Sequence, residues 1–306
     1  MDLKQIEYFV HVAELGSFTR AASVLRVAQP ALSRQVRSLE VELRQPLFDR
    51  NGRGVTLTEA GKRLLAHGRG ILQQVQRAKE DLEDQRGAAS GRLAIGLPPS
   101  VSRTLTGPLV EAFRKRFPKA TLTVVEGLST YALEWLALGR IDCAAVYNAT
   151  PAAAIDLAPV LDEPLHLVSA RKSGVGDKPM TLARVAECDL VIPSRPHAIR
   201  MLLETALAGV GLKPRVGLEI ESVPAMLDLV ERNPLHAVLA ANALAGREAA
   251  FTARPIMVGR DQPLAARLWL ATSSQRPRGP LLEQGAALLV QMLRERLVQA
   301  VSPLRR

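Results

Sequence analysis

The sequence predicts an α/β protein with an N-terminal winged helix-turn-helix, and three observations lead to this expectation. The first 58 residues show the apolar spacing of three short helices, followed by a short hairpin. Residues 58 to about 87 continue as one long pattern of helical period. From Arg92 onward, apolar strands alternate with helices, which is typical of an α/β domain with a largely parallel sheet.

The first two helices are predicted over residues 3–15 and 19–25. Apolar side chains recur on one face of the first helix, and Gly16 is the residue type that commonly follows a helix C-terminus. Ser17 is a candidate N-cap of the second helix, because its hydroxyl can accept an N–H of the first turn. This arrangement is the first part of a helix-turn-helix.

The third helix is predicted to enter the DNA major groove. Pro30 stands in its first turn, where a missing N–H costs little. Arginine side chains match guanine O6 and N7, and glutamine can match adenine. An ordinary three-helix domain with solvated arginines is the alternative, and it does not account for the basic outer face combined with a basic hairpin. The outward face of this helix carries Gln29, Ser33, Arg34 and Arg37.

A wing is predicted after the third helix. Residues 47–50 and 55–57 read as short strands around an Asn-Gly pair, which is a strong hairpin signal. Arg53 would stand at the tip, where it suits contact with the minor groove or the DNA backbone.

The first sixty residues resemble the N-terminal domain of LysR-type transcriptional regulators. The resemblance implies a DNA-binding regulator rather than an enzyme, and it implies that Gln29, Pro30, Ser33, Arg34 and Arg53 touch DNA. A weaker resemblance, to the nitrogen-assimilation-control branch of this family, lies in residues 94–99, 193–194 and 219–222. The family pattern is matched by Phe9, Gly16-Ser17-Phe18, Ala21-Ala22, Leu25, Gln29 to Ser33, Leu39-Glu40, Leu43, Leu47-Phe48, Arg50, Leu57-Thr58 and Gly61.

Composition bears on where in the cell the protein is expected, but it is not what predicts DNA binding. The 306-residue chain has a formal net charge of +10, yet residues 1–53 hold eight basic against six acidic side chains. The prediction of DNA binding therefore rests on where the charges stand and not on their total. The chain has neither an apolar run of about 20 residues nor the form of a signal peptide, so a cytoplasmic protein is expected.

Two cysteines, Cys143 and Cys188, cannot form a disulfide framework. Cys143 lies in an apolar run, which favours a buried inert thiol. A thiol switch is the alternative, because the family that the N-terminus resembles includes a peroxide-sensing branch.

Residues 59–87 are expected to form a linker helix that pairs with the same helix of a second copy. Thr58 is a candidate N-cap of this helix. A helix that packs only on its own domain is the alternative. The expected seam, with steps of three and four residues, is Gly61, Leu64, Gly68, Ile71, Val75, Ala78 and Leu82.

Residues 91–306 are predicted to form a domain of two lobes. Periodicity alone predicts an α/β unit, and the family resemblance implies a two-lobed effector domain similar to periplasmic solute-binding proteins. Crossovers near 161–164 and 261–266 divide it into lobe I, about 91–161 plus 267–306, and lobe II, about 162–266. The expected strands are 92–97, 121–125, 141–147, 165–170, 190–193, 215–220, 237–240 and 267–272, and the expected helices are 105–117, 131–138, 198–208, 223–231 and 280–298.

An effector pocket is predicted where strands of both lobes end. Ligands of open α/β sheets bind beyond the carboxyl ends of strands, and helix N-termini there favour an anion. Each hydroxyl could instead only cap its own helix. The candidate effector-binding residues are Ser100, Ser102, Ser129, Thr130, Ser194, Arg195 and His197.

The chain shows no catalytic, cofactor-binding or metal-binding constellation. It lacks a phosphate-binding loop and a dinucleotide fingerprint, and its five histidines show no metal spacing. Asp142 matches a structural aspartate of the family and is not a predicted catalyst. An enzyme or a transport-type solute binder is therefore disfavoured.

The expected function is a transcriptional regulator, most simply an activator, that binds a palindromic operator as a dimer or tetramer. Its partners would be double-stranded DNA, RNA polymerase and a small anionic effector. The alternative is an effector-independent regulator of the same family, controlled by its abundance.

Overall fold

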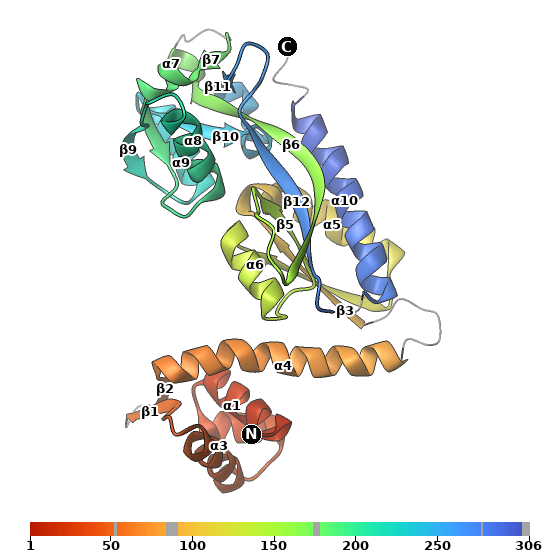
Figure 1. Cartoon of the computed structure of the whole chain (residues 1–306). Coiled ribbons are helices and arrows are strands. Elements are labelled where there is room, and N and C mark those ends of the chain that lie inside the picture. The colour runs from red at the N-terminus through yellow and green to blue at the C-terminus, as the bar shows by residue number, and fades with distance from the viewer. Residues whose placement is uncertain (52–53, 84–90, 174–177, 277, 302–306) are drawn as a thin grey trace. The chain divides into compact units, whose positions relative to one another are not determined.

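The chain divides into two compact units, one formed mainly by Met1–Gly87 and the other mainly by the residues from Ala88 on. Figure 1 shows this computed structural model, with helices and strands labelled. The structure describes residues 1–51, 54–83, 91–173, 178–276 and 278–301.

The N-terminal unit is a winged helix-turn-helix, as predicted. Asp2 begins the first helix with a capping box, and Gly16 ends it in the left-handed conformation, with φ of 60°. Ser17 accepts a hydrogen bond from the Arg20 N–H and so caps the second helix. The elements are α1 (Leu3–Leu15), α2 (Phe18–Leu25), α3 (Gln29–Leu43), the hairpin β1 (Phe48–Asn51) and β2 (Gly54–Leu57), and α4 (Glu59–Glu83).

The first half of α4 packs on its own unit, which corrects the predicted seam. A side chain on Gly61 would meet the Leu47 carbonyl oxygen at 2.1 Å, and one on Gly68 would meet Val10 and Ile6. Both glycines therefore allow close approach of α4 within one chain. Two later seam positions, Val75 and Ala78, are at least partly exposed. A partner helix could meet this later part of the predicted seam without displacing those contacts.

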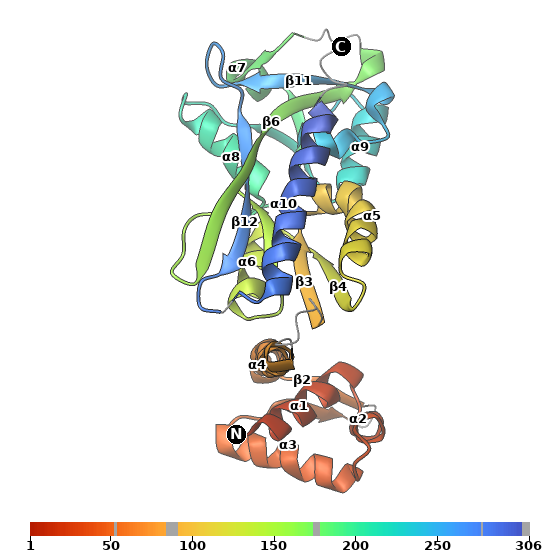
Figure 2. The same cartoon turned by 90° about the vertical axis from the view of Figure 1, so that its right-hand side faces the viewer.

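The C-terminal unit is built on one mixed ten-stranded sheet rather than a largely parallel one. Its main path runs β4-β3-β5-β12-β6-β10-β8-β9. β3 is parallel to both β4 and β5, and β8 is parallel to both β9 and β10. We call the half with β3, β4 and β5 lobe I and the half with β7 to β11 lobe II. Antiparallel β12 and β6 join them (Figure 2).

The strand bounds confirm most of the predicted strands of the C-terminal unit. The first predicted crossover, 161–164, lies inside the long strand β6, which pairs with β12 up to Pro164 and with β10 from Leu165 on. Strands β7 and β11 were not predicted. The strands are β3 (Gly91–Leu97), β4 (Ala120–Glu126), β5 (Cys143–Tyr147), β6 (Ile155–Ala170), β7 (Met180–Thr181), β8 (Asp189–Ile192), β9 (Arg215–Glu219), β10 (His236–Ala240), β11 (Phe251–Met257) and β12 (Ala265–Ser273).

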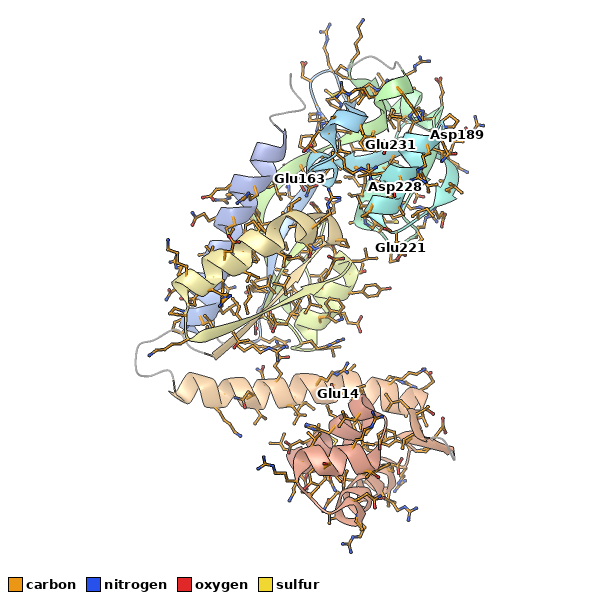
Figure 3. The ribbon with its side chains drawn as sticks, turned by 180° about the vertical axis from the view of Figure 1, so that it is seen from behind. Glu14, Glu163, Asp189, Glu221, Asp228 and Glu231 are labelled. Carbon is orange, nitrogen blue, oxygen red and sulfur yellow. The ribbon has the colours of Figure 1, made fainter. Side chains whose placement is uncertain are left out.

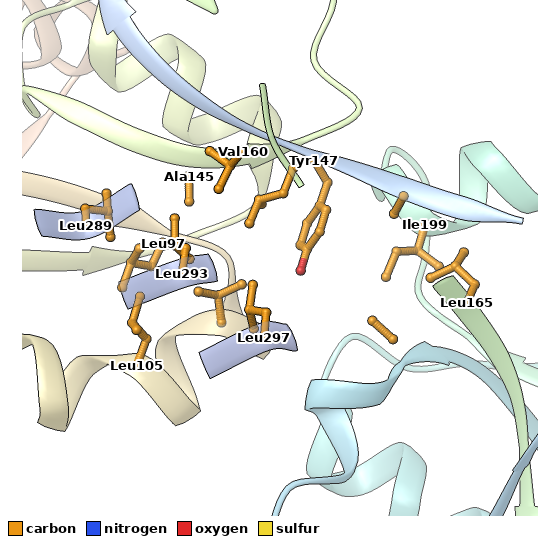
Figure 4. Close-up of a cluster of buried hydrophobic side chains, with 14 of the residues drawn as sticks. Leu97, Leu105, Ala145, Tyr147, Val160, Leu165, Ile199, Leu289, Leu293 and Leu297 are labelled. Carbon is orange, nitrogen blue, oxygen red and sulfur yellow. The ribbon is translucent and has the colours of Figure 1, made fainter. Parts of the chain in front are cut away.

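One hydrophobic core runs through both lobes and holds them together. It contains Leu97 and Leu105 of lobe I, Leu190 and Leu203 of lobe II, and Leu293 of the last helix. Figure 4 shows part of this cluster. The helices around the sheet are α5 (Pro99–Arg116), α6 (Ser129–Ala137), α7 (Leu182–Ala186), α8 (Ala198–Ala208), α9 (Val223–Arg232) and α10 (Pro280–Val301), with short 3₁₀ turns η2 (Arg171–Ser173), η3 (Ala241–Leu244) and η4 (Glu248–Ala250).

Candidate functional site

Helix α3 presents the predicted polar face to its surroundings. Its inner stripe, Leu32, Val36 and Leu39, is fully buried, which fixes the rotation of the helix. The predicted DNA-contacting residues Gln29, Pro30, Arg34 and Arg37 are exposed, and Ser33 is half-buried beside them.

The charges around this face leave its arginines available. Neither Arg34 nor Arg37 forms an ion pair or hydrogen bond with the described residues. Several acids of the unit are engaged elsewhere. Glu40 accepts from the N–H groups of Leu47 and Phe48, at 2.8 and 3.2 Å. Asp2 caps α1, Glu14 pairs with Arg69, Glu42 pairs with the N-terminus and Glu59 pairs with Lys62. The outer face of α3 is therefore positively charged.

The predicted wing residue Arg53 lies outside the described residues. The flanking hairpin is present, with Phe48 opposite Leu57 and Asn51 opposite Gly54. Phe48 packs its ring against Phe9 at 5.3 Å between centroids, which fixes the base of the wing to α1. A role of Arg53 in DNA contact stays a prediction.

A pocket lies where the parallel strands of both lobes end. Its wall residues lie at or just beyond the carboxyl ends of all six parallel strands, three in each lobe, as expected for ligand sites of open α/β sheets. The cavity in this pocket has a volume of about 30 Å³, which is enough for a water molecule. The lining residues are Pro98, Pro99, Ser100, Leu128, Ser129, Tyr147, Pro193, His197, Ala198, Ile199, Glu221, Val223, Met226, Val238, Leu239, Ala240 and Ala243.

Three of the seven predicted effector residues, Ser100, Ser129 and His197, line this pocket. Two of these side chains also accept hydrogen bonds from backbone N–H groups. The Ser129 hydroxyl accepts the Tyr147 N–H at 2.9 Å, and His197 Nδ1 accepts the Ile199 N–H at 3.3 Å. His197 therefore caps its own helix α8, whereas Ser129 accepts from strand β5, and neither bond excludes ligand contact.

The other four predicted effector residues do not line the pocket. Ser102 shares a hydrogen bond with Thr106, and Thr130 is exposed on α6. The Ser194 hydroxyl donates to Glu221 at 2.6 Å, and Arg195 donates to Glu204 at 3.0 Å. Strand order predicted correctly which loops border the pocket. The side chains of these four residues, however, point away from it.

Arg200, the other arginine of this loop region, holds lobe II together. Its guanidinium donates to Glu204, Glu219 and the Pro193 carbonyl at 2.9, 2.7 and 2.9 Å. The side chain is 9% exposed, so these bonds satisfy a nearly buried cation. Arg200 is thereby engaged in the fold.

Tyr147, which lines the pocket, contacts a buried acid that sequence reasoning missed. Tyr147 donates its hydroxyl to Glu163, which lies on β6 and is labelled in Figure 3. Burial raises the pKa of Glu163 to about 7. Burial and the neighbouring Glu163 also raise the pKa of Tyr147, so the phenol stays protonated. The sequence did not single out Glu163, because Asp156 and Asp162 lie on the same strand.

Cys143 and Asp142 both occupy structural positions. Cys143 is fully buried on β5, and burial raises the pKa of its thiol far above the usual range. Asp142 accepts the Ala94 N–H at 2.7 Å and so joins two strands. Within the described residues, no group of three His, Cys, Asp or Glu side chains is placed to hold a metal ion. None of the described helices is long and apolar enough to span a membrane.

Comparisons with known proteins agree with this architecture. Residues 3–62 match the family described as "Bacterial regulatory helix-turn-helix protein, lysR family", and residues 86–297 match "LysR substrate binding domain". The chain is 37% identical to the nitrogen assimilation regulatory protein nac of Klebsiella aerogenes over 224 residues, 73% of each chain. This identity confirms the predicted likeness to the nitrogen-assimilation branch. The chain is also 36% identical to a hydrogen peroxide-inducible genes activator of Dickeya chrysanthemi over 167 residues, 55% of each chain.

Solved structures of full-length regulators share the fold. The crystal structure of CbnR, a LysR family transcriptional regulator, has a TM-score of 0.71 at 23% identity and covers 95% of this chain and 99% of its own. Full-length CbnR complexed with its target DNA also has a TM-score of 0.71, at 24% identity, with 95% and 100% covered. Both family matches and the identity to nac lead to one conclusion: this chain belongs to the LysR family, and it is a transcriptional regulator with an effector-binding domain rather than an enzyme.

Proposed function

We propose that the regulator recognises a palindromic operator by placing α3 in the major groove and Arg53 in or beside the minor groove. The observation that carries this proposal is the exposed face of α3, where Arg34 and Arg37 have no partner among the described residues. Gln29, Pro30 and Ser33 border the same face and complete the proposed contact set. Phosphates and base edges would supply the missing acceptors.

A palindromic operator requires at least two copies of the chain. The later part of α4, from Val75 on, supports pairing because it extends beyond the part that packs on α1. We propose a dimer through this part of α4 and a tetramer through the C-terminal units. A regulator that binds the chromosome acts in the cytoplasm, where we expect it to activate transcription by contact with RNA polymerase.

The pocket between the lobes is the proposed effector site. A ligand regulates only if it binds one arrangement of the chain better than another. Parting the lobes to admit a larger molecule would be such a difference. The pocket residues Ser100, Ser129 and His197 are the proposed contacts from the sequence prediction.

An effector-independent regulator is the second candidate, and a specific observation favours it. The hydrophobic core continues through both lobes. Arg103 of α5 also donates to the carbonyls of Ala243 and Ala245 in lobe II, at 3.2 and 2.7 Å. These contacts stabilise the closed pocket, so DNA binding could proceed without a ligand and follow the amount of protein.

Titration of the full-length chain against its own upstream DNA tests the proposed function. Binding should weaken as salt rises, with a log–log slope that reports the number of neutralised phosphates. An unrelated duplex of equal length is the control. Equal affinity for both duplexes would contradict sequence-specific recognition.

A further inference from the structure

A groove runs along the C-terminal unit between α10 and the strands β6 and β12, which lie beside each other in Figure 2. Its volume is about 900 Å³, and it shares no lining residue with the pocket between the lobes. Leu157 of β6, Leu270 of β12 and Leu282 of α10 line it and are only half-buried. Covering these apolar side chains would be favourable, so the groove suits a protein partner.

Helix α10 borders this groove with a single row of side chains, which we call the α10 row. The row consists of Glu283, Ala287, Val290 and Arg294, all of which line the groove. Its steps of four, three and four residues keep the four side chains on one face of the helix. Leu289, on the opposite face, is fully buried, which fixes the rotation of α10. The row is therefore held toward the groove and solvent.

The two charges at the ends of the α10 row are not neutralised within the described residues. Glu283 forms no ion pair or side-chain hydrogen bond there, and Arg294 donates only to the Val160 carbonyl, at 3.3 Å. Arg278, at the same groove, pairs with Asp156 at 2.6 Å and shows the contrast. The row thus begins with an acid and ends with a base, each available to an opposite charge.

The spacing of the α10 row is the same in both directions. Two copies of α10 that lie antiparallel across a two-fold axis would therefore bring equivalent levels of the row together. With the axis at the middle of the row, Glu283 of one copy faces Arg294 of the other, and Ala287 faces Val290. A two-fold axis repeats each contact, so the pairing contains two ion pairs and two apolar contacts.

The charges also exclude the parallel arrangement. Parallel helices in the same register would place Glu283 against Glu283 and Arg294 against Arg294, and like charges repel. Ala287, near the middle of the row, is small and exposed, so a second helix can approach closely there. Val290 of the second copy would then add apolar contact beside the groove.

We propose that two copies of the chain associate through this groove, with their α10 helices antiparallel and Glu283 paired with Arg294 at both ends. This inference rests on the proposed function and narrows it, because it names the face through which the C-terminal units form the tetramer. Dimers formed through α4 would be joined in pairs by α10. One assembly would then carry the DNA-binding units for two palindromic sites.

Charge exchange at the ends of the α10 row tests this arrangement. Glu283→Arg would place two arginines together at each end, and Arg294→Glu would place two glutamates together. In sedimentation of the full-length chain over a range of concentrations, each change should raise the dissociation constant of tetramer into dimers by about tenfold or more. The double variant Glu283→Arg with Arg294→Glu restores opposite charges and should return to within about threefold of the wild type.

Glu134→Arg is the matched control, because it makes the same charge change at an exposed position of α6. It should keep the wild-type dissociation constant. Both Glu283 and Arg294 are exposed, so thermal unfolding of the variants should show an intact fold. A double variant that stays as weak as the single ones would overturn the facing of Glu283 and Arg294.

Three further outcomes would overturn the proposal. The first is an unchanged dissociation constant in both single variants, and the second is a wild-type chain that forms no tetramer. The third is loss of activated transcription in the single variants with unchanged association, which would assign the groove to a different protein.

Operator binding by the same preparations separates this inference from the proposed function. Glu283→Arg should bind a duplex with one palindrome as the wild type does, and it should lose cooperative binding to a duplex with two. Specific binding by the wild type together with unchanged tetramers in the single variants overturns the α10 contact and leaves the proposed function intact. Loss of specific binding in the wild-type chain contradicts the proposed function whatever the association shows.

Discussion

The outer face of α3 and the pocket of the C-terminal unit use the same residue type in opposite ways. Arg34 and Arg37 stand on α3 without a partner among the described residues, whereas Arg195 and Arg200 near the pocket are paired with Glu204. An arginine without a partner can bind a phosphate or a base edge. A paired one stabilises the fold. Whether an arginine in this chain is paired therefore depends on the acids near it and not on the arginine itself.

The largest expected effect concerns Glu163, the buried acid that accepts from the pocket residue Tyr147. The pKa of Glu163 is raised from 4.5 to about 7 in the folded chain, so between these values the folded state binds the proton more tightly than the unfolded state. The free energy of unfolding therefore falls as pH rises through this window, by about 3 kcal/mol in total. Glu163→Gln should remove this loss and stabilise the C-terminal unit by about that amount near pH 8.

His166 gives a second signal when stability is measured against pH, because its contribution to the pH dependence of the free energy of unfolding has the opposite sign. Burial lowers its pKa from 6.5 to about 4, so the unfolded state binds the proton more tightly. Its contribution to the free energy of unfolding is lost as pH falls through that window. In the wild-type chain the Glu163 slope opposes the His166 slope, and in Glu163→Gln this opposing slope should be absent. Denaturant unfolding at several pH values checks this, and equal pH profiles for both proteins would contradict it.

The next effect tests the α3 side of the comparison. Arg34→Ala should weaken binding to the operator by about 1–3 kcal/mol and relax the preference for one base pair. The measurement is a binding-site selection followed by titration of selected duplexes. Arg195→Ala is the matched control, because its exposed guanidinium pairs with Glu204 and should not affect DNA affinity. Equal losses for the two variants would remove Arg34 from base recognition.

These two regions also differ in how far the sequence could predict them. Residues near each other in the chain determine the α3 face: Leu32, Val36 and Leu39 point inward, so Arg34 and Arg37 must point outward. Local spacing is enough for that conclusion. The prediction of the winged unit was accordingly confirmed helix by helix.

The pocket depends on residues that are distant in sequence. Strand order placed its loops correctly, but Tyr147 meets Glu163 only because the long strand β6 crosses both lobes beside β12 and β10. Pro159 and Pro164 obscured that strand, since proline rarely stands inside a sheet. The serines at the helix starts could be predicted from the sequence, whereas the burial of Glu163 could be recognised only from the fold.

A smaller effect is expected where an arginine is paired. Arg200→Ala leaves Glu219 and the Pro193 carbonyl without this donor and leaves Glu204 with Arg195 alone, and it should destabilise lobe II. Since Glu219 is 49% exposed, water can replace part of the loss, and we expect about 2 kcal/mol. Unfolding of the variant measures the change. Operator affinity at low temperature should stay the same, which separates this arginine from Arg34.

The smallest expected effect concerns the thiols, where the alternatives were an inert side chain and a redox switch. Burial raises the pKa of Cys143 far above the usual range and also raises that of Cys188, so the reactive thiolate is scarce at both. A disulfide reagent should label Cys143 only after unfolding, and operator affinity should not change on mild peroxide treatment. Cys188, which is partly exposed and donates to the Arg184 carbonyl at 3.2 Å, should be labelled slowly. Rapid labelling of Cys143 in the folded chain would contradict its burial and return the switch to consideration. In that case the likeness to the peroxide-inducible activator would extend from sequence to mechanism.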